Sequence, residues 1–183
     1  MSIGDEVVHG IPSKKVVLKE GDLLSLDVGM EYEGVFVDMA RTIVVDGVDK
    51  ADEQTKKLLK TGEGALVIAV QEARVGNSMG DIGEAVQNYV ELNGFGVVRK
   101  LVGHGVGGAV HEEPEVPNFG KKGEGERLQK GMVLALEPMV TEKDFDVLLD
   151  ENKWTWKTKD GARVAHFEDT VVVGEGGGEV VTN

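Results

Sequence analysis

The stretch that decides the fold is LLSLDVGMEYEGVFVDMARTIVV, residues 23–45. Its two halves are rich in Val, Ile, Leu and Phe and flank the turn-forming segment EYEG, which predicts a β-hairpin. If the turn centres between Tyr32 and Glu33, Asp27 faces Asp38 across the two strands. Directly opposed residues have Cβ atoms about 4.5–5.5 Å apart, and like charges there are destabilising. The pair therefore needs a shared proton or a cation, and a divalent metal fits best.

A solvated sheet face on which two aspartates happen to align is the alternative explanation. The rest of the chain weighs against it, because GHGVGGAVHEEP, LALEPMV and RVAHFEDTVVV place more carboxylate and imidazole groups within apolar, strand-like runs. Buried carboxylates are costly unless they are paired or bind a metal. The candidate ligands that share this setting are Asp27, Asp38, His104, Glu137 and Glu168.

The chemistry of this donor set points to a class of metal. Four carboxylates and one imidazole suit Mn, Fe, Co or Zn, and the absence of cysteine excludes a thiolate site. Two ions that share bridging carboxylates are the natural number for five protein ligands. The residues therefore predict a dinuclear metal centre.

Two helical segments follow the hairpin. Residues 51–74 carry apolar residues at helical spacing, and a second such stripe follows Ser78, which can cap a helix that Asn93-Gly94 ends. From residue 97 onward we expect short strands and glycine-rich turns. The predicted strands are VVRKLV, the GHGVGGAVH segment, MVLALEPMV, a WTWKT hairpin and RVAHFEDTVVV. Helices segregated from a largely antiparallel sheet predict an α+β fold, formed as a single domain over residues 1–183.

The order of these motifs resembles the type I methionine aminopeptidases, metallopeptidases with the pita-bread fold. The resemblance covers nearly the whole chain and rests on VVHGIP, LKEGDLLSLDVG, GVFVDMARTIVV, GHGVGGAVHEEP, EPMV and WTWKTKDGARVAHFEDT. A single GHG or EPM would mean little, whereas five ligand positions and two further histidines agree in order and type. The resemblance implies an antiparallel sheet with helices on its outer side.

The resemblance also implies how the ligands divide between two divalent ions (Mn, Co, Fe or Zn). Asp38 and Glu168 would bridge both ions, Asp27 would chelate one, and His104 with Glu137 would complete the other. Two ions of this kind lower the pKa of a water and polarise a scissile carbonyl, which is the chemistry of peptide hydrolysis.

The resemblance also implies roles for further residues. Glu137 would accept the proton of the attacking water, and His111 would contact the substrate carbonyl and stabilise the oxyanion. His9 would act beside the substrate backbone, with a structural role as the alternative. Trp154 matches a family position at the mouth of the substrate pocket. Val110 stands where similar enzymes commonly place an aromatic residue.

His166 precedes Glu168 by two residues, so on one strand both side chains would share a face. Because five protein donors already surround the metals, we expect His166 to orient Glu168 or a water from behind them. A purely structural histidine is the alternative.

The leading functional interpretation is a metal-dependent aminopeptidase that removes the N-terminal methionine from peptides or nascent proteins with a small second residue. Another pita-bread peptidase of the Xaa-Pro type is the first alternative, and a truncated relative that only binds peptides is the second. The single histidine before the HEEP run favours the first reading. A phosphate cradle at GHGVGGAVH is a weak reading, because no GxGxxG joins a strand to a helix.

Composition indicates which classes of binding partner are excluded and where the protein is located. The net charge of −13 argues against a nucleic-acid surface, and no apolar run approaches the length of a membrane span. The segment MSIGDEVVHG lacks the pattern of a signal peptide. Together with the absence of cysteine, these features predict a cytoplasmic protein.

Enzymes of the resembling family carry a considerable segment before VVHGIP, whereas Met1 lies only eight residues ahead of His9. We therefore expect a shortened pita-bread fold in which the strands at 23–30 and 35–45 lack cover on one face. Such a face predicts self-association to a homo-oligomer or reduced stability. A pocket open on one side predicts a looser preference for methionine.

Overall fold

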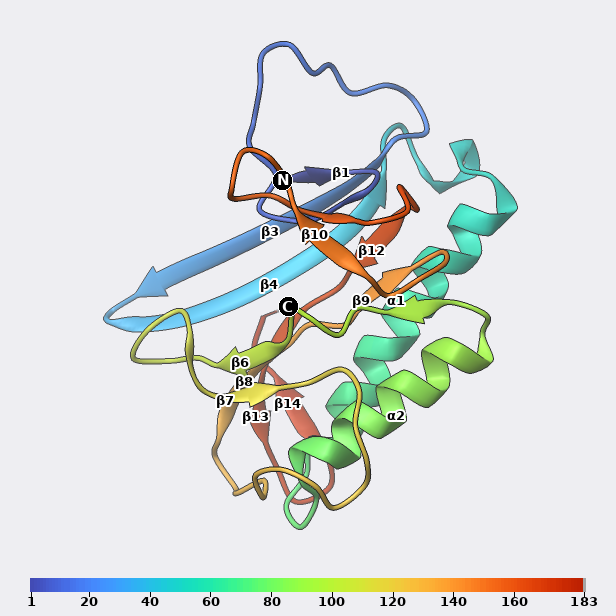
Figure 1. Cartoon of the computed structure of the whole chain (residues 1–183). Coiled ribbons are helices and arrows are strands. Elements are labelled where there is room, and N and C mark those ends of the chain that lie inside the picture. The colour runs from blue at the N-terminus through green and yellow to red at the C-terminus, as the bar shows by residue number, and fades with distance from the viewer. Residues whose placement is uncertain (183) are drawn as a thin grey trace.

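The computed structural model describes residues 1–182 (Figure 1). Helices α1 (Glu53–Glu72) and α2 (Met79–Leu92) lie side by side along one flank of the strands, and the 3-10 helix η1 (Val48–Lys50) precedes them (Figure 1). Each predicted helix is present within a few residues of its predicted limits.

The residues at the helix ends explain those limits. The Asp52 carboxylate accepts a hydrogen bond from the Thr55 N–H at 2.7 Å, which satisfies a free amide of the first turn of α1. Ser78 precedes α2, as predicted. Gly94, with φ of +83°, takes the left-handed conformation that ends a helix.

Every strand pair is antiparallel, and within the described residues the strands form four sheets. The first sheet has the strand order β1 (Ser2–Ile3), β3 (Leu23–Tyr32), β4 (Val35–Val44), and the second has the order β10 (Val147–Leu149), β11 (Trp156–Thr158), β2 (Glu6–Val8). The third sheet has the order β12 (Val164–His166), β9 (Met139–Thr141), β5 (Gly96–Val97). The fourth sheet has the order β14 (Gly178–Val180), β13 (Asp169–Val173), β8 (Val133–Leu136), β6 (Gly103–Gly105), β7 (Glu112–Val116). Helix α1 packs on strands of the third and fourth sheets, and α2 packs on β5 and β7. The predicted α+β class is confirmed.

The hairpin of β3 and β4 is present, but its predicted register is wrong. Asp27 lies opposite Ala40 and Asp38 lies opposite Gly29. The reason is the turn, which is centred one residue later than predicted, at Glu33-Gly34, with φ of +51° and +82°. Positive φ at both central residues matches the twist of a two-residue hairpin. Asp27 and Asp38 are therefore diagonal neighbours on one face instead of a directly opposed pair.

Two runs predicted as single strands are each broken at an acidic residue. MVLALEPMV divides into β8 and β9 at Glu137-Pro138, and RVAHFEDTVVV divides into β12 and β13 at Phe167-Glu168. Because β8 pairs with β13 and β9 pairs with β12, both runs change sheet at the same level of the molecule. Pro138 cannot donate to a ladder, which favours the break there.

The predicted strand at 97–102 is also shorter than expected, since the regular strand ends at Val97 and the Val98 N–H makes one further bond to the Met139 carbonyl. The hydrophobic core lies between the two helices and the third and fourth sheets. Its largest fully buried aliphatic side chains include Leu58, Ile82, Leu134 and Leu136. Among the described residues, no helix has the length and apolar character needed to cross a membrane.

Candidate metal centre

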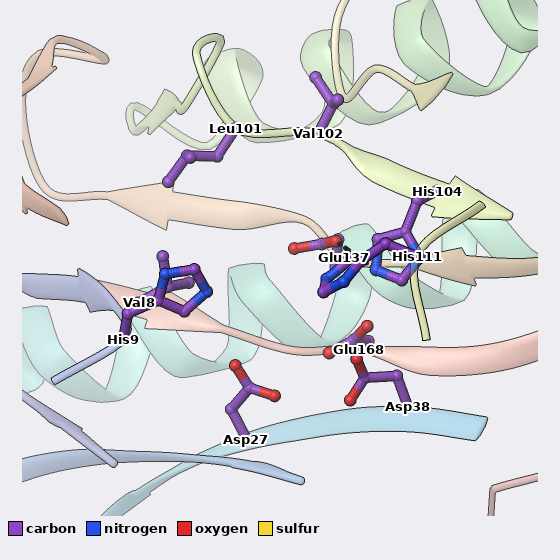
Figure 2. Close-up of a pocket in the computed structure, with 10 residues that line it drawn as sticks. All are labelled: Val8, His9, Asp27, Asp38, Leu101, Val102, His104, His111, Glu137 and Glu168. Atoms are coloured by element: carbon purple, nitrogen blue, oxygen red, sulfur yellow. Dashed lines mark ion pairs between the residues drawn. The ribbon is translucent and has the colours of Figure 1, made fainter. Parts of the chain in front are cut away.

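A cavity of about 140 Å³ gathers the predicted ligands (Figure 2). Asp27 and Asp38 reach it from the β3–β4 hairpin, and His104 reaches it from β6 (Figure 2). The other acidic and imidazole groups approach from segments just outside the named strands. The lining residues are Val8, His9, Asp27, Asp38, Leu101, Val102, His104, His111, Glu137 and Glu168.

The ligand atoms form overlapping groups in which all atoms lie within 4.8 Å of one another. One group joins Asp27, Asp38 and Glu168, and another joins His104, Glu137 and Glu168. A third group contains Asp38, His104 and His111. Glu168 belongs to both of the first two groups, so its carboxylate stands between the hairpin ligands and the ligands of the fourth sheet.

Backbone pairing sets the positions of the two buried carboxylates. The peptide groups of Glu168 and Ala40 exchange hydrogen bonds at 2.9 and 3.2 Å, which joins the strand break to the hairpin. The Thr170 hydroxyl donates to the Asp38 carbonyl at 2.8 Å. The Arg41 guanidinium donates to the carbonyls of Ala40 and Glu168. The carboxylates therefore sit on a backbone frame that is bonded on several sides.

Burial and like charge act together on these carboxylates. Only 2% of the Glu168 surface is exposed, and burial raises the pKa of Glu168 well above its ordinary value, with the charges of Glu137, Asp38 and Asp27 adding to the effect. Burial and the Asp27 charge also raise the pKa of Asp38, which His104 partly opposes. Neither lysine nor arginine occurs among the described residues that line the cavity. Without a lysine or arginine to offset the carboxylates, the site favours a cation.

His104 shows where a cation fits. Its Nδ1 lies 2.9 Å from the Gly105 carbonyl, which can only accept, so Nδ1 carries a proton and donates. In the neutral ring, Nε2 then presents a lone pair, and it lies 3.4 Å from Glu137 Oε1. Two acceptors facing each other are reconciled by a cation between them. A metal-binding histidine typically donates one ring N–H to a carbonyl and offers the other nitrogen to the metal, as His104 does here. The residues therefore fit a divalent ion.

The two further histidines approach from different walls. The His111 ring centroid lies 4.3 Å from that of His104, with the planes inclined by 59°. His9 lies beside Val8, across the cavity from His104 and His111 (Figure 2). Trp154 does not line the cavity, but its ring stacks on His9 at a centroid distance of 5.4 Å. Val110 also lies outside the lining.

His166 is 1% exposed and lies behind the ligands. Its Nε2 is 3.5 Å from Glu137 Oε2 and 3.9 Å from Glu168 Oε2. Neither ring nitrogen has a hydrogen-bond partner among the described residues. The prediction that His166 and Glu168 lie on one strand is wrong, because β12 ends at His166. The ring nonetheless adjoins the carboxylates of Glu137 and Glu168.

The sequence interpretation missed the apolar wall formed by Val8, Leu101 and Val102. The available signal was their position immediately before His9 and just before His104, since residues next to ligands in the chain often share the site. Apolar residues of this kind also occur throughout the core, so composition alone did not distinguish them.

Residues 2–175 match metallopeptidase family M24. The chain is 45% identical to the methionine aminopeptidase of Clostridium acetobutylicum, over 99% of this chain and 71% of that protein. It is 43% identical to methionine aminopeptidase 1 of Bacillus subtilis, over 100% of this chain and 72% of that protein. The chain belongs to metallopeptidase family M24.

Solved structures refine this placement. The methionine aminopeptidase of Thermotoga maritima superposes with a TM-score of 0.95 and 46% identity, covering 100% of this chain and 72% of that one. The prolidase of Pyrococcus horikoshii superposes with a TM-score of 0.73 and 25% identity, covering 100% of this chain and 47% of that one. Within the family, the chain groups with the methionine aminopeptidases. The predicted resemblance and the pita-bread fold are confirmed, and family and donor set together imply divalent metal ions.

Proposed function

We propose that the protein is a dinuclear metal-dependent aminopeptidase that hydrolyses the N-terminal methionine from peptides or nascent proteins with a small second residue. The observation that carries this proposal is the pair of ligand groups that share Glu168. Asp27, Asp38 and Glu168 would hold one ion, and Asp38, Glu168, His104 and Glu137 the other, with Asp38 and Glu168 bridging. Mn, Co, Fe and Zn all suit these ligands.

Bound ions of this kind supply an activated water at neutral pH and polarise a carbonyl. The side chains of the chain perform the other steps. Glu137 accepts the proton of the attacking water, and its place on the cavity wall supports this role. His111 donates a hydrogen bond to the substrate carbonyl oxygen and stabilises the charge that develops there. His9 contacts the substrate backbone from the opposite wall.

The small cavity supports the preference for a small second residue. A volume of about 140 Å³ must hold the metal ions together with the atoms around the scissile bond. Val8, Leu101 and Val102 add an apolar surface suited to an unbranched apolar side chain such as that of methionine. Trp154, which stacks on His9, and Val110 would contact the substrate at the mouth of the cavity. A cytoplasmic location accords with a substrate that is a newly made protein.

The test uses protein stripped of metal with a chelator and then loaded with Mn, Co, Fe or Zn. Bound metal is counted by elemental analysis, and hydrolysis is followed with Met-Ala-Ser, Met-Leu-Ser and Ala-Pro. We expect two ions per chain and rapid release of Met from Met-Ala-Ser, with little from Met-Leu-Ser. Hydrolysis of Ala-Pro in place of Met-Ala-Ser would favour the Xaa-Pro alternative, and peptide binding without hydrolysis by the loaded protein would favour the binding relative.

A further inference from the structure

His9 has an uncommon backbone conformation at the edge of the cavity. Its φ is +60°, in the left-handed region that residues with a Cβ rarely adopt. A conformation of this kind persists when the surroundings hold it in place, and it is often found at binding and catalytic sites. The contacts of the following peptide group show what holds it.

The peptide group between His9 and Gly10 is bonded at both of its ends. The Thr155 hydroxyl donates to the His9 carbonyl at 3.0 Å, and the Gly10 N–H donates to Ser2 Oγ at 3.1 Å. Thr155 is fully buried and Ser2 is 4% exposed, so water does not compete for either bond. Because the peptide group is planar, bonds at both ends fix its orientation and hence ψ of His9.

Close packing around Gly10 further restricts the backbone conformation of this segment. A Cβ on Gly10 would overlap the Met1 carbonyl oxygen and would lie 2.7 Å from a carboxylate oxygen of Glu6. The backbone after His9 therefore passes through a space that only glycine fits. His9 cannot relax to an ordinary conformation by moving this segment outward without losing both hydroxyl contacts.

Thr155 also connects His9 to its stacking partner. Asn152 Nδ2 donates to the Thr155 hydroxyl at 2.9 Å, which leaves the hydroxyl proton for the His9 carbonyl. The Asn152 Oδ1 accepts from the N–H groups of Trp154 and Thr155 at 2.8 and 2.9 Å. This turn thereby presents Trp154, whose ring stacks on His9 with an interplanar angle of 29°.

We propose that Thr155 and Ser2 are positioning residues that clamp the His9–Gly10 peptide group and so aim the His9 ring into the cavity. Neither residue touches the substrate site, and each acts through His9. The kinetic arm of the test rests on the proposed aminopeptidase function, whereas the spectroscopic arm does not.

The kinetic arm compares Thr155→Val, which keeps the shape and removes the hydroxyl, with Thr155→Ser, which keeps the hydroxyl. We expect Thr155→Val to lower kcat/KM for Met-Ala-Ser about tenfold, as befits one lost buried hydrogen bond, and Thr155→Ser to restore most of it. In a His9→Ala background, Thr155→Val should cause no further loss, because the two changes act on one contact. A loss of the same factor in both backgrounds would overturn the proposal.

The spectroscopic arm uses a Trp156→Phe background, which leaves Trp154 as the one tryptophan. Loss of stacking in His9→Ala sets the reference emission. Thr155→Val and Ser2→Ala should both shift the Trp154 emission toward that reference, and Thr155→Ser should not. Unchanged emission in both variants would refute the clamp, whether or not the protein hydrolyses peptides. If Thr155→Val does not fold, Ser2→Ala gives the same decision, since it releases the other end of the peptide group.

Discussion

Glu168 is almost fully buried in the candidate metal centre, and the charges of Glu137, Asp38, Asp27 and Asp169 add to the effect of burial on its carboxylate. Its raised pKa means that burial and the neighbouring charges disfavour the charged form in the metal-free protein. A divalent ion reverses this preference because it holds the carboxylate in the charged form. Burial and the Asp27 charge likewise disfavour the charged form of Asp38, which shares one ligand group with Glu168. These two residues therefore link metal binding to the charge of the site.

We expect Asp38→Ala and Glu168→Ala each to abolish hydrolysis and most metal uptake. A carboxylate that serves two ions also shields them from each other, so its loss affects both. Metal content by elemental analysis and affinity by calorimetry measure the effect. Glu31→Ala is the matched control, because it removes an exposed carboxylate from the same hairpin. Binding of two ions by either variant would show that the bridging assignment is wrong.

His111→Ala should lower turnover by about 10²–10³, the usual effect of removing one donor to an oxyanion. Metal content and unfolding temperature should remain those of the parent protein, because His111 is exposed at the cavity and contributes little to the core. Steady-state kinetics with Met-Ala-Ser, together with thermal unfolding, measures both. Loss of folding or of metal in the variant would indicate a structural or ligand role instead.

His166→Phe tests the buried ring behind Glu137. Phenylalanine retains the ring shape but removes the nitrogen that lies 3.5 Å from Glu137 Oε2. We expect a loss of metal affinity of about tenfold or more with the fold retained, since partners behind the ligands typically have this effect. Calorimetric titration of metal into the stripped variant is the measurement. His166→Gln, which keeps a donor, should lose less, and equal affinity in all three proteins would leave the ring with a packing role.

Among the secondary-structure elements, the strand ends matter most for the site, because two of its carboxylates lie where strands are interrupted. Glu137 follows β8 and Glu168 lies between β12 and β13, so both carboxylates occupy the level at which two runs change sheet. Residues at such a break lie outside the regular hydrogen bonding between strands. Their side chains are therefore not restricted to the two faces of a sheet and can point toward one cavity. Asp27 and Asp38 meet this point from a continuous hairpin.

Helix α2 supplies a pH-dependent prediction through Asp81. Its Oδ2 accepts from the N–H and O–H of Ser78 at 3.0 and 2.6 Å and from the Gly123 N–H at 3.1 Å. The Ser78 hydroxyl, as the largest cause, lowers the pKa of Asp81. A lowered folded-state pKa contributes stability that is present above the ordinary carboxyl range and is lost as pH falls through the folded-state value.

We therefore expect Asp81→Asn to reduce the free energy of unfolding by about 1 kcal/mol at neutral pH, comparable to the loss of a helix cap. The difference from the parent protein should shrink as the pH falls below about 4, where Asp81 of the unfolded chain becomes protonated, and should vanish below the lowered folded-state pKa of Asp81. Urea unfolding of metal-free protein across this range is the measurement. Glu84→Gln removes the same charge further along α2 and serves as the control. A difference that stays constant with pH would contradict the prediction.

At the scale of the whole molecule, the β3–β4 hairpin has two unlike faces. One face carries Asp27 and Asp38, and strand alternation puts most of the exposed apolar residues on the other. This apolar face is exposed, with exposed fractions of 58% for Val28, 55% for Met30, 69% for Tyr32, 56% for Val35 and 44% for Ile43. Contiguous apolar surface of this kind is uncommon on soluble monomers and marks an interaction surface.

We expect the chain to self-associate through this face at rising concentration, which is one of the two outcomes that the sequence predicted, the other being reduced stability. Sedimentation velocity over a concentration series measures the association. Met30→Lys should reduce it, because a charge in the centre of the face opposes burial. Leu92→Lys is the control, since Leu92 is an exposed apolar residue at the end of α2, away from the hairpin. A monomer at every concentration would show that the exposed face does not associate, and a panel of X-Ala-Ser peptides would then test the looser methionine preference separately.

The sequence by itself determined the features that consecutive residues encode. The two helices followed from apolar spacing and, for the second, from Ser78 and Asn93-Gly94 at its ends, because capping involves neighbours in the chain. The Asp52 cap of α1 was seen only in the structure. The choice of candidate ligands followed from residue chemistry, since carboxylate and imidazole within apolar runs need partners. The M24 family placement followed from the order of the motifs.

Only the tertiary structure decided how these groups meet. The hairpin register depended on positive φ at Glu33 and Gly34, and a shift of the turn by one residue moved Asp27 from opposite Asp38 to a diagonal position. The breaks at Glu137 and Glu168 arose because each half of a run found a partner in a different sheet. The clamp on His9 joins residues 146 positions apart. Such contacts arise from packing between distant segments, which local sequence patterns do not record.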